Sequence, residues 1–315
     1  RLPALLEALE QHSPFAGDAR SLVRQIVAQP TEGLRQLFIE KWRASLVGSL
    51  LQLQQQIAEA EREKQRQEIE DQLLANRTLA DALDPFATRV VSFHFGLPDA
   101  ALVARIKRWG SVVMSSATTV EEGLWLQQHG ADVVIAQGLE AGGHRGHFLS
   151  DDLSRQMGLM ALLPQLVAAL DLPVVAAGGL ADAAGVRAAM ALGAAGVQTG
   201  TVWLCCPEAT TSAVHRAALT GPDAAHTALT TAFTGRPARG IVNRAMRELG
   251  HLPATAPAFP TATAAMAPLR SHWEAQGRGD FTPLWAGQNT RGCRPVPAAE
   301  VVNTLAAGLT RGPDR

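Results

Sequence analysis

The segment LEAGGHRGH at residues 139–147 contains the residue types of a proton-transfer site. Histidine is the side chain best suited to proton transfer near neutral pH, and His144 stands among closely spaced glycines. Glycine lets the main chain approach a ligand closely and leaves N–H donors accessible. The glycines of this region are Gly138, Gly142, Gly143 and Gly146. We predict that His144 is catalytic; the alternative is a flexible loop whose histidine has no chemical role.

Two later glycine turns predict an anion site. Gly178 and Gly179 follow an apolar run and precede a helical pattern. The next apolar run ends in Gln198, Thr199, Gly200 and Thr201. Unpaired N–H groups and the helix dipole both favour an anion at such turns, so we expect them to form a phosphate cradle. Neither the dinucleotide motif GxGxxG nor the phosphate loop GxxxxGK[ST] occurs in its required context.

The remaining reactive side chains give weaker signals. Cys205 and Cys206 are adjacent and Cys293 is distant, a spacing that suits neither metal ligation nor a disulfide framework. We expect buried thiols, no metal, and a reducing, cytoplasmic setting. His94 either faces a site at a strand end or is a hydrogen-bonded core histidine. The cluster PLWAGQN at residues 283–289, with Trp285, Gly287 and Gln288, has no role that its residue types reveal.

Short apolar runs alternate with helical patterns from residue 89 onward. The predicted strands are 89–96, 111–119, 131–138, 172–179 and 195–204. The predicted helices between them are 99–110, 120–130, 154–170 and 181–193. This alternation predicts a parallel sheet covered on both faces, with the site at the carboxyl ends of the strands. A doubly wound sheet and a (β/α)8 barrel both fit, and Thr118 with Glu121 predicts a capping box at the helix over 120–130.

Composition divides the chain into two parts. Residues 1–85 hold 23 charged residues and 3 glycines, and residues 86–315 hold 34 and 25. In the first part apolar residues recur at helical spacing over residues 37–57, which predicts a helical segment over 1–85. After the fifth strand the chain becomes rich in Ala, Thr and Pro, and we expect loops at 234–240 and 253–263 within a helical cover of the sheet.

Charge and hydropathy exclude several classes of partner. The net charge is -1 with 47% hydrophobic residues, so no global electrostatic force favours nucleic acid or an anionic membrane. The chain contains no apolar run of about 18 residues and no secretory pattern, so we expect no membrane segment. A small neutral or anionic ligand fits this composition better, and self-association stays open.

Eight segments, in this order, resemble the nitronate monooxygenases, formerly called 2-nitropropane dioxygenases. They are VVSFHFGLP, SSATTVEE, VVIAQGLEAGGHRG, LPVVAAGGLADAAGV, ALGAAGVQTGT, TGRPARG, AFP and PLWAGQ, within about residues 88–310. Members of that family are FMN-dependent (β/α)8 barrels that oxidise alkyl nitronates with O2. The resemblance implies that His144 is the catalytic histidine and that Gln137 and Gly142 contact the flavin. It further implies that FMN phosphate is held by Gly179, Gln198, Thr199, Gly200 and Thr201.

The first strands of the family pattern do not appear in the sequence. Residues 1–85 occupy their place, and the resemblance begins at what would be the fourth strand of the barrel. We therefore predict an α/β fold with a TIM-barrel-like parallel sheet that is altered or incomplete at its N-terminal side. Either residues 1–85 cover the open side, or the chain is incomplete, or another pairing completes the sheet.

The resemblance leads to one function and two alternatives. The first is FMN-dependent oxidation of alkyl nitronates, with nitronate and O2 as substrates. The second is an FMN-dependent enoyl-thioester reductase, because those enzymes are similar in the histidine loop. The third is a non-catalytic scaffold that keeps the flavin fold without its early strands.

Overall fold

The computed structural model describes residues 78–309. The chain divides after Asn76 into two units, and the described residues all belong to the second, which begins at Arg77. The predicted helical segment over residues 1–85 lies outside the described residues except for its last eight. Of these, residues 78–83 are helical and a 3-10 turn, η1, follows at Asp84–Phe86. The predicted division into 1–85 and 86–315 stays a prediction.

Five parallel strands form the main sheet, as the alternation of apolar runs predicts. Their order in the sheet is β1-β2-β3-β5-β6. The strands are β1 Val90–Phe93, β2 Val112–Ala117, β3 Val133–Gln137, β5 Val174–Ala177 and β6 Gly196–Gln198. The prediction that the last strand reaches residue 204 is wrong, because the chain turns into the 3-10 helix η3, Thr201–Trp203, directly after the glycine of the QTGT run.

Four helices make the crossovers between these strands. They are α4 Ala100–Arg108, α5 Val120–Gln128, α6 Leu159–Ala169 and α7 Ala183–Ala191. Three of them begin at a side-chain cap, and at α5 this cap is Thr119, whose hydroxyl accepts from Glu122 N–H. The predicted box of Thr118 and Glu121 is therefore shifted by one residue. Helix α6 starts at Leu159 instead of 154, because a 3-10 turn, η2, occupies Leu153–Arg155.

The four helices cover one face of the parallel sheet. Because side chains alternate along a strand, Val134 and Ala136 of β3 pack with α5 and α6, while Ile135 and Gln137 point to the opposite face. The sequence predicts a sheet that is covered on both faces, and in the structure these helices lie on one of them. The opposite face borders a cavity, which is the arrangement of a barrel interior, and the curled five-stranded sheet is half of a TIM-barrel-like fold.

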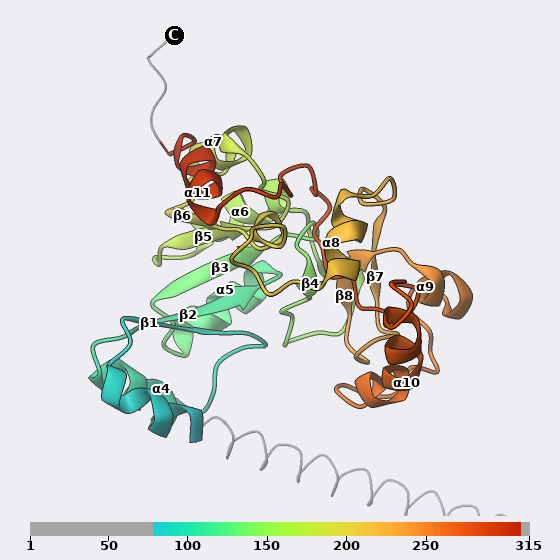
Figure 1. Cartoon of the computed structure of the whole chain (residues 1–315). Helices are drawn as coiled ribbons and strands as arrows, with labels where there is room; N and C mark the ends of the chain where they lie inside the picture. Colours follow the sequence, from blue (N-terminus) through green and yellow to red (C-terminus); the bar gives the residue numbers. More distant parts are fainter. Residues whose placement is uncertain (1–77, 310–315) are drawn as a thin grey trace, which may run out of the picture. The chain divides into compact units, whose positions relative to one another are not determined.

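A second, antiparallel sheet joins two strands that follow the crossover region to a short strand in the loop after β3, and we predicted only helices and loops for these segments. Its strands are β4 Gly143–His144, β7 Thr227–Thr230 and β8 Ala238–Ile241, in the order β4-β8-β7. Strand β8 begins inside the predicted loop 234–240. It contains Arg239 and Gly240, so its sequence lacks the alternation of apolar and polar residues that is typical of a strand. In Figure 1 this sheet lies to the right of the parallel sheet, with helices α8 Ala213–Thr220, α9 Arg244–Leu249 and α10 Ala262–Glu274.

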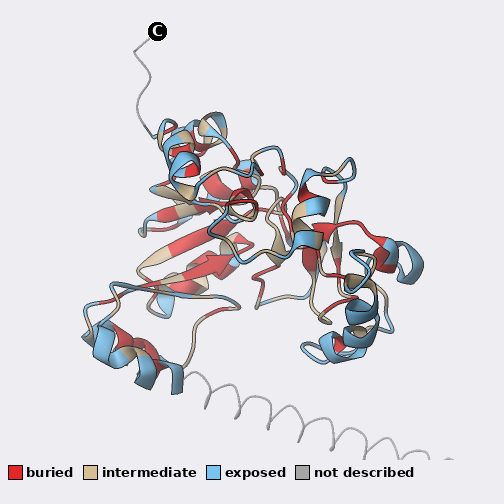
Figure 2. Ribbon diagram, viewed as in Figure 1, coloured by how far each residue is buried: buried red, intermediate tan, exposed pale blue. Residues whose placement is uncertain are grey.

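Helix α10 begins inside the predicted loop 253–263, and a last helix, α11 Ala298–Ala306, packs against α7. Figure 2 shows β2 and β3 largely buried and the outer sides of α4 and α10 exposed. Among residues 78–309, we find no helix of the length and apolar character needed to cross a membrane.

The core between the sheet and its helices gives a stability prediction. Leu162 of α6 is fully buried among the apolar side chains of β3 and β5, whereas Met160 of the same helix is 62% exposed. We expect Leu162→Ala to lower the free energy of unfolding by about 2–5 kcal/mol, because it leaves a cavity in a packed layer. Met160→Ala should change it by less than about 0.5 kcal/mol. Urea unfolding checks both, and equal effects of the two variants would contradict this packing.

Candidate functional site

One cavity of about 420 Å³ lies at the carboxyl ends of the parallel strands. It brings together all eight residues that the sequence predicts for the site. They are Gln137, Gly142, His144, Gly179, Gln198, Thr199, Gly200 and Thr201. It also contains side chains to which the sequence assigns no definite role, namely His94, Ser116, Ile135, Trp285 and Asn289. This volume and position are typical of a small-molecule site in a parallel α/β fold.

His144 stands on β4, at the edge of the second sheet, and its ring is half-buried in the cavity wall. Its Nε2 lies 2.9 Å from Thr234 Oγ1. Burial lowers the pKa of His144 below the ordinary value for histidine, and the charges of His94 and Arg236 lower it further. The imidazole is therefore neutral at pH 7 and can accept a proton or a hydrogen bond.

Aromatic rings surround this imidazole on several sides. The ring centroid of His144 lies 5.6 Å from that of Phe259, 5.7 Å from that of Trp285 and 6.2 Å from that of Phe95. The Phe95 and Phe259 rings meet it edge-on, a favourable geometry for aromatic pairs. Of these three rings, that of Trp285 lines the cavity and gives it an apolar surface beside His144.

Gln137, the last residue of β3, has both ends of its side-chain amide engaged. Its Nε2 donates to the main-chain oxygen of His144 at 2.9 Å, and its Oε1 accepts from Gly146 N–H at 2.7 Å. The side chain thus connects the end of β3 to both sides of the histidine segment. The sequence predicts a ligand contact for Gln137. The structure shows in addition that its side chain holds the main chain on both sides of Arg145, at His144 and Gly146.

Arg145 is a residue of the site that sequence reasoning missed. Its side chain is fully buried and donates to the main-chain oxygens of Gln137 at 2.8 Å and Gly138 at 2.7 Å and to Gln156 Oε1 at 2.7 Å. Burial lowers its pKa to about 10, which still leaves the guanidinium charged at neutral pH. The available signal was the arginine directly after the predicted catalytic histidine.

The predicted cradle is formed by two neighbouring strand ends, β5 and β6. Gly179 has a φ of +68° and Gly200 is the residue before η3. The N–H groups of both glycines donate to no acceptor among the described residues, although both residues line the cavity. A Cβ on Gly200 would meet no atom within 4 Å, so the space beside it is open. Unpaired N–H groups beside open space suit an anion such as a phosphate.

Trp285 explains part of the cluster whose role the sequence left open. Its main chain bridges to Gly240 of β8, and the carbonyl of Trp285 lies 3.0 Å from His215 Nε2 of α8. The segment around it therefore acts as an additional extended strand beside β8. Its ring is held next to His144, which no local sequence pattern could indicate.

The end of the same segment, residues 283–289, reaches the cradle. Gly287 N–H donates to Thr201 Oγ1 at 2.9 Å, which leaves the hydroxyl hydrogen of Thr201 available to a ligand. Asn289 Nδ2 donates to the oxygen of Gly179 at 3.1 Å. Asn289, and not Gln288, is the amide side chain that lines the cavity. The segment thus ties the cradle to the histidine side of the site.

The three cysteines are free and buried. Burial raises the pKa of the Cys293 thiol to about 12, and the Cys205 thiol beside it has a raised pKa for the same reason. Neither is a thiolate at neutral pH. Within residues 78–309, no group of three His, Cys, Asp or Glu side chains is arranged to hold a metal ion.

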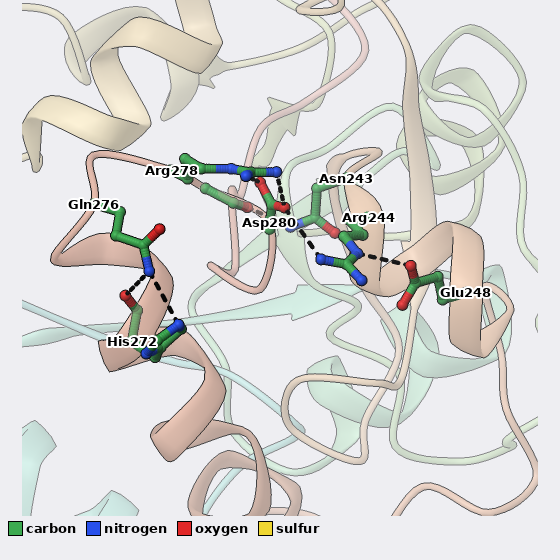
Figure 3. Close-up of polar contacts among 8 residues, drawn as sticks. Asn243, Arg244, Glu248, His272, Gln276, Arg278 and Asp280 are labelled. Carbon is green, nitrogen blue, oxygen red and sulfur yellow. Dashed lines mark hydrogen bonds and ion pairs between the residues drawn. The ribbon is translucent and has the colours of Figure 1, made fainter.

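A second cavity of about 550 Å³ lies between α8, α9 and the loop after α10. Figure 3 shows its charged side chains, which face one another. Arg278 Nη2 lies 2.6 Å from Asp280 Oδ2, and Arg244 Nε lies 2.7 Å from Glu248 Oε1. Because these guanidinium groups already have carboxylate partners, this cavity is a weaker candidate than the one beside His144.

The buried histidines predict how stability depends on pH. Burial lowers the pKa of His144, His147 and His215 in the folded chain. In the unfolded chain the histidines have a pKa of about 6.5, so this chain binds more protons than the folded one at mildly acidic pH. The free energy of unfolding should therefore fall as the pH is lowered from about 7.5 to about 5.5. Urea unfolding at the two pH values checks this expectation.

A matched pair of variants identifies the histidines responsible. His147 is 2% exposed, and His147→Gln should weaken the pH dependence. His272→Gln, on an exposed position of α10, serves as the control. Stability that stays constant or rises toward pH 5.5 in the unchanged chain would contradict the prediction.

Comparison with known proteins agrees with the motifs and the geometry. A family model for nitronate monooxygenase matches residues 23–308, so the match begins before the motifs near residue 88. A nitronate monooxygenase of Pseudomonas aeruginosa is 43% identical, over 75% of this chain and 68% of that protein. A probable nitronate monooxygenase of Bacillus subtilis is 41% identical, over 71% of this chain and 65% of that protein.

Two solved structures share the fold. A nitroalkane oxidase from Streptomyces ansochromogenes is 44% identical with a TM-score of 0.68, covering 73% of this chain and 66% of that one. The FabK protein of Thermotoga maritima is 25% identical with a TM-score of 0.58, covering 73% and 70%. The chain thus spans about two thirds of the length of these relatives. The extent of the family match and the identity of these relatives show that the chain belongs to the nitronate monooxygenase family.

Proposed function

We propose that this chain binds FMN in the cavity beside His144 and oxidises alkyl nitronates with O2. The observation that carries the proposal is that all eight predicted site residues, drawn from three separate stretches of the chain, line a single cavity. Membership of the family and the likeness to a nitroalkane oxidase support it.

The residues present fit the phosphate end of FMN. The unpaired N–H groups of Gly179 and Gly200 offer hydrogen bonds to phosphate oxygens without a charged side chain. The hydroxyl groups of Thr199 and Thr201 add further donors on the same side. Bound there, FMN would supply the electron transfer and the reaction with O2 that no side chain provides.

The other side of the cavity fits a small organic anion. We assign Gln137 and Gly142 to the side of the flavin and His144 to the substrate. The neutral imidazole acts either as a base on the substrate carbon or as a hydrogen-bond partner of the nitro group. The Trp285 ring, which lines the cavity beside His144, offers an apolar surface for an alkyl chain.

The setting we propose is the cytoplasm. Three free, buried thiols in one chain suit a reducing compartment. The partners in this proposal are small molecules, namely the nitronate and O2.

Flavin retention is the experiment that tests the proposal directly. The full chain is mixed with FMN and desalted, its visible absorbance is recorded, and alkyl nitronate is then added under air. We expect retained flavin and consumption of O2. Loss of all flavin by a folded chain would overturn the proposal and favour the scaffold alternative. Retained flavin with NAD(P)H-dependent consumption of an enoyl thioester, and none of nitronate, would favour the reductase.

Gly179→Val tests the cradle. An added Cβ at Gly179 would come within 3.1 Å of Glu140 Cβ, and the φ of +68° disfavours any side chain, so the substitution should shift the turn that presents the Gly179 N–H. We expect clearly weaker FMN retention, measured as flavin per chain after desalting. Gly250→Val is the control, because Gly250 has a φ of +83° and no neighbour within 4 Å of an added Cβ. Gly200→Val, at an unstrained φ of -120°, should act like Gly179→Val, and full flavin content in both would contradict the cradle.

His144→Ala tests the catalytic assignment. We expect FMN to stay bound and turnover of alkyl nitronate to fall by about 10²-fold or more, the usual scale for a proton-transfer group. Steady-state O2 consumption measures it. His215→Ala is a control at another partly buried histidine of the described part, which lies behind Trp285. Unchanged turnover in His144→Ala would refute the assignment.

A further inference from the structure

His94 lies on the wall of the same cavity, one residue after β1 ends. Its side chain is exposed to the cavity and its Nδ1 lies 3.2 Å from Ser116 Oγ of β2. Its Nε2 lies 3.3 Å from the main-chain oxygen of His144. The ring also fills the space beside Gly146, where an added Cβ would come within 2.7 Å of its Cε1. His94 therefore touches the histidine segment both through a hydrogen bond and through packing.

The hydrogen-bond chemistry defines which nitrogen carries the proton. A carbonyl oxygen only accepts, so His94 Nε2 must be the N–H that donates to His144. In the neutral ring, Nδ1 is then the acceptor, and the hydroxyl of Ser116 donates to it. The carbonyl of His144 thus defines the tautomer, and the Ser116 hydroxyl stabilises it by donating to Nδ1. The same carbonyl accepts from Gln137 Nε2, so both of its lone pairs are engaged.

The turn after His94 holds the ring in this orientation. Phe95 has a φ of +66° and Gly96 a φ of +91°, so the chain reverses directly after the histidine. A non-glycine residue in this region is strained and persists only where its surroundings hold it. Here the Arg236 guanidinium carbon lies 4.1 Å from the centre of the Phe95 ring, and Ser115 Oγ donates to the oxygen of Gly96 at 2.7 Å.

We propose that His94 is a positioning residue of the active site, which as the neutral Nε2–H tautomer held by Ser116 fixes the main chain of His144 together with Gln137. This inference rests on the proposed function, because it concerns the same cavity. Displacement of a reacting group by about 1 Å can lower a rate by about 10²-fold, so the carbonyl contact has a direct effect on turnover. His94 needs no contact with substrate for this role.

The surroundings of His94 agree with a neutral ring. Removal of the ring from water lowers its pKa below the ordinary histidine value, although the bond to His144 opposes this, and the charges of Arg236, Arg145 and His147 lower it further. These three groups and His144 are the titratable or charged groups that face the ring. When His94 becomes protonated at acidic pH, its positive charge lowers the pKa of His144, so removal of the His94 imidazole should raise that pKa.

The test compares His94→Leu, which removes the donor, with His94→Gln, whose Nε2 is as many bonds from Cβ as that of histidine. Ser116→Ala removes the hydroxyl that donates to His94 Nδ1, and His129→Gln, at an exposed histidine of the α5 end, is the control. In the full chain with FMN, we expect kcat on ethylnitronate to fall by about 10- to 100-fold in His94→Leu. His94→Gln should stay within about threefold of the unchanged chain, and Ser116→Ala should fall between them.

A second measurement does not depend on turnover. We expect the pKa of the His144 imidazole, followed by NMR titration, to rise in both His94 variants and to stay unchanged in His129→Gln. A kcat unchanged in His94→Leu, or a His144 titration unmoved in either His94 variant, would overturn the proposal. If His94→Leu does not fold, kcat is compared between Ser116→Ala and the unchanged chain, and the His144 titration is followed in His94→Gln. A chain without nitronate turnover would refute the proposed function, and the titration alone would then decide on His94.

Discussion

The Arg145 guanidinium lies without exposed surface at the carboxyl end of β3, and no carboxylate of the described residues lies within ion-pair distance of it. Burial of a charge costs several kcal/mol unless polar groups surround it. Here the main-chain oxygens of Gln137 and Gly138 and the amide oxygen of Gln156 accept its hydrogen bonds. The charge therefore fixes the end of β3 and the segment that follows it as one unit.

The histidine segment depends on this unit. Gln137, whose own carbonyl is held by Arg145, uses its side chain to hold the main chain at His144 and Gly146. Buried Glu122 holds the next residues, because its Oε1 accepts from Phe148 N–H at 2.7 Å. A short strand of two residues, β4, can thus occupy a defined place, although so few ladder bonds would not hold it alone.

The site forms where the parallel sheet and the antiparallel sheet meet. The parallel sheet contributes the cradle at Gly179 and Gly200, and the antiparallel sheet contributes the surroundings of the His144 ring. The segment over residues 283–289 connects them, because it pairs with β8 and also donates to Thr201 of the cradle. A cofactor held at one side and a substrate held at the other would thus keep a fixed relation to each other.

Local patterns in the sequence predict the parallel sheet, which the structure confirms, and they predict the residues that the structure brings to one cavity. The apolar runs and the helices between them follow from local patterns, and residues just after parallel strands must meet at one edge, so His144 and the QTGT run could be placed together in advance. The sequence could not predict the second sheet, because β8 contains Arg239 and Gly240 and has no alternating pattern. Nor could it predict the roles of His94, Arg145 and Trp285. The partners of His94 and Trp285 are distant in the chain, and the hydrogen bond from His94 to the carbonyl of His144 forms only once the end of β1 and β4 both border the cavity. Tertiary structure alone decided which of the polar side chains hold the site and which of them face a ligand.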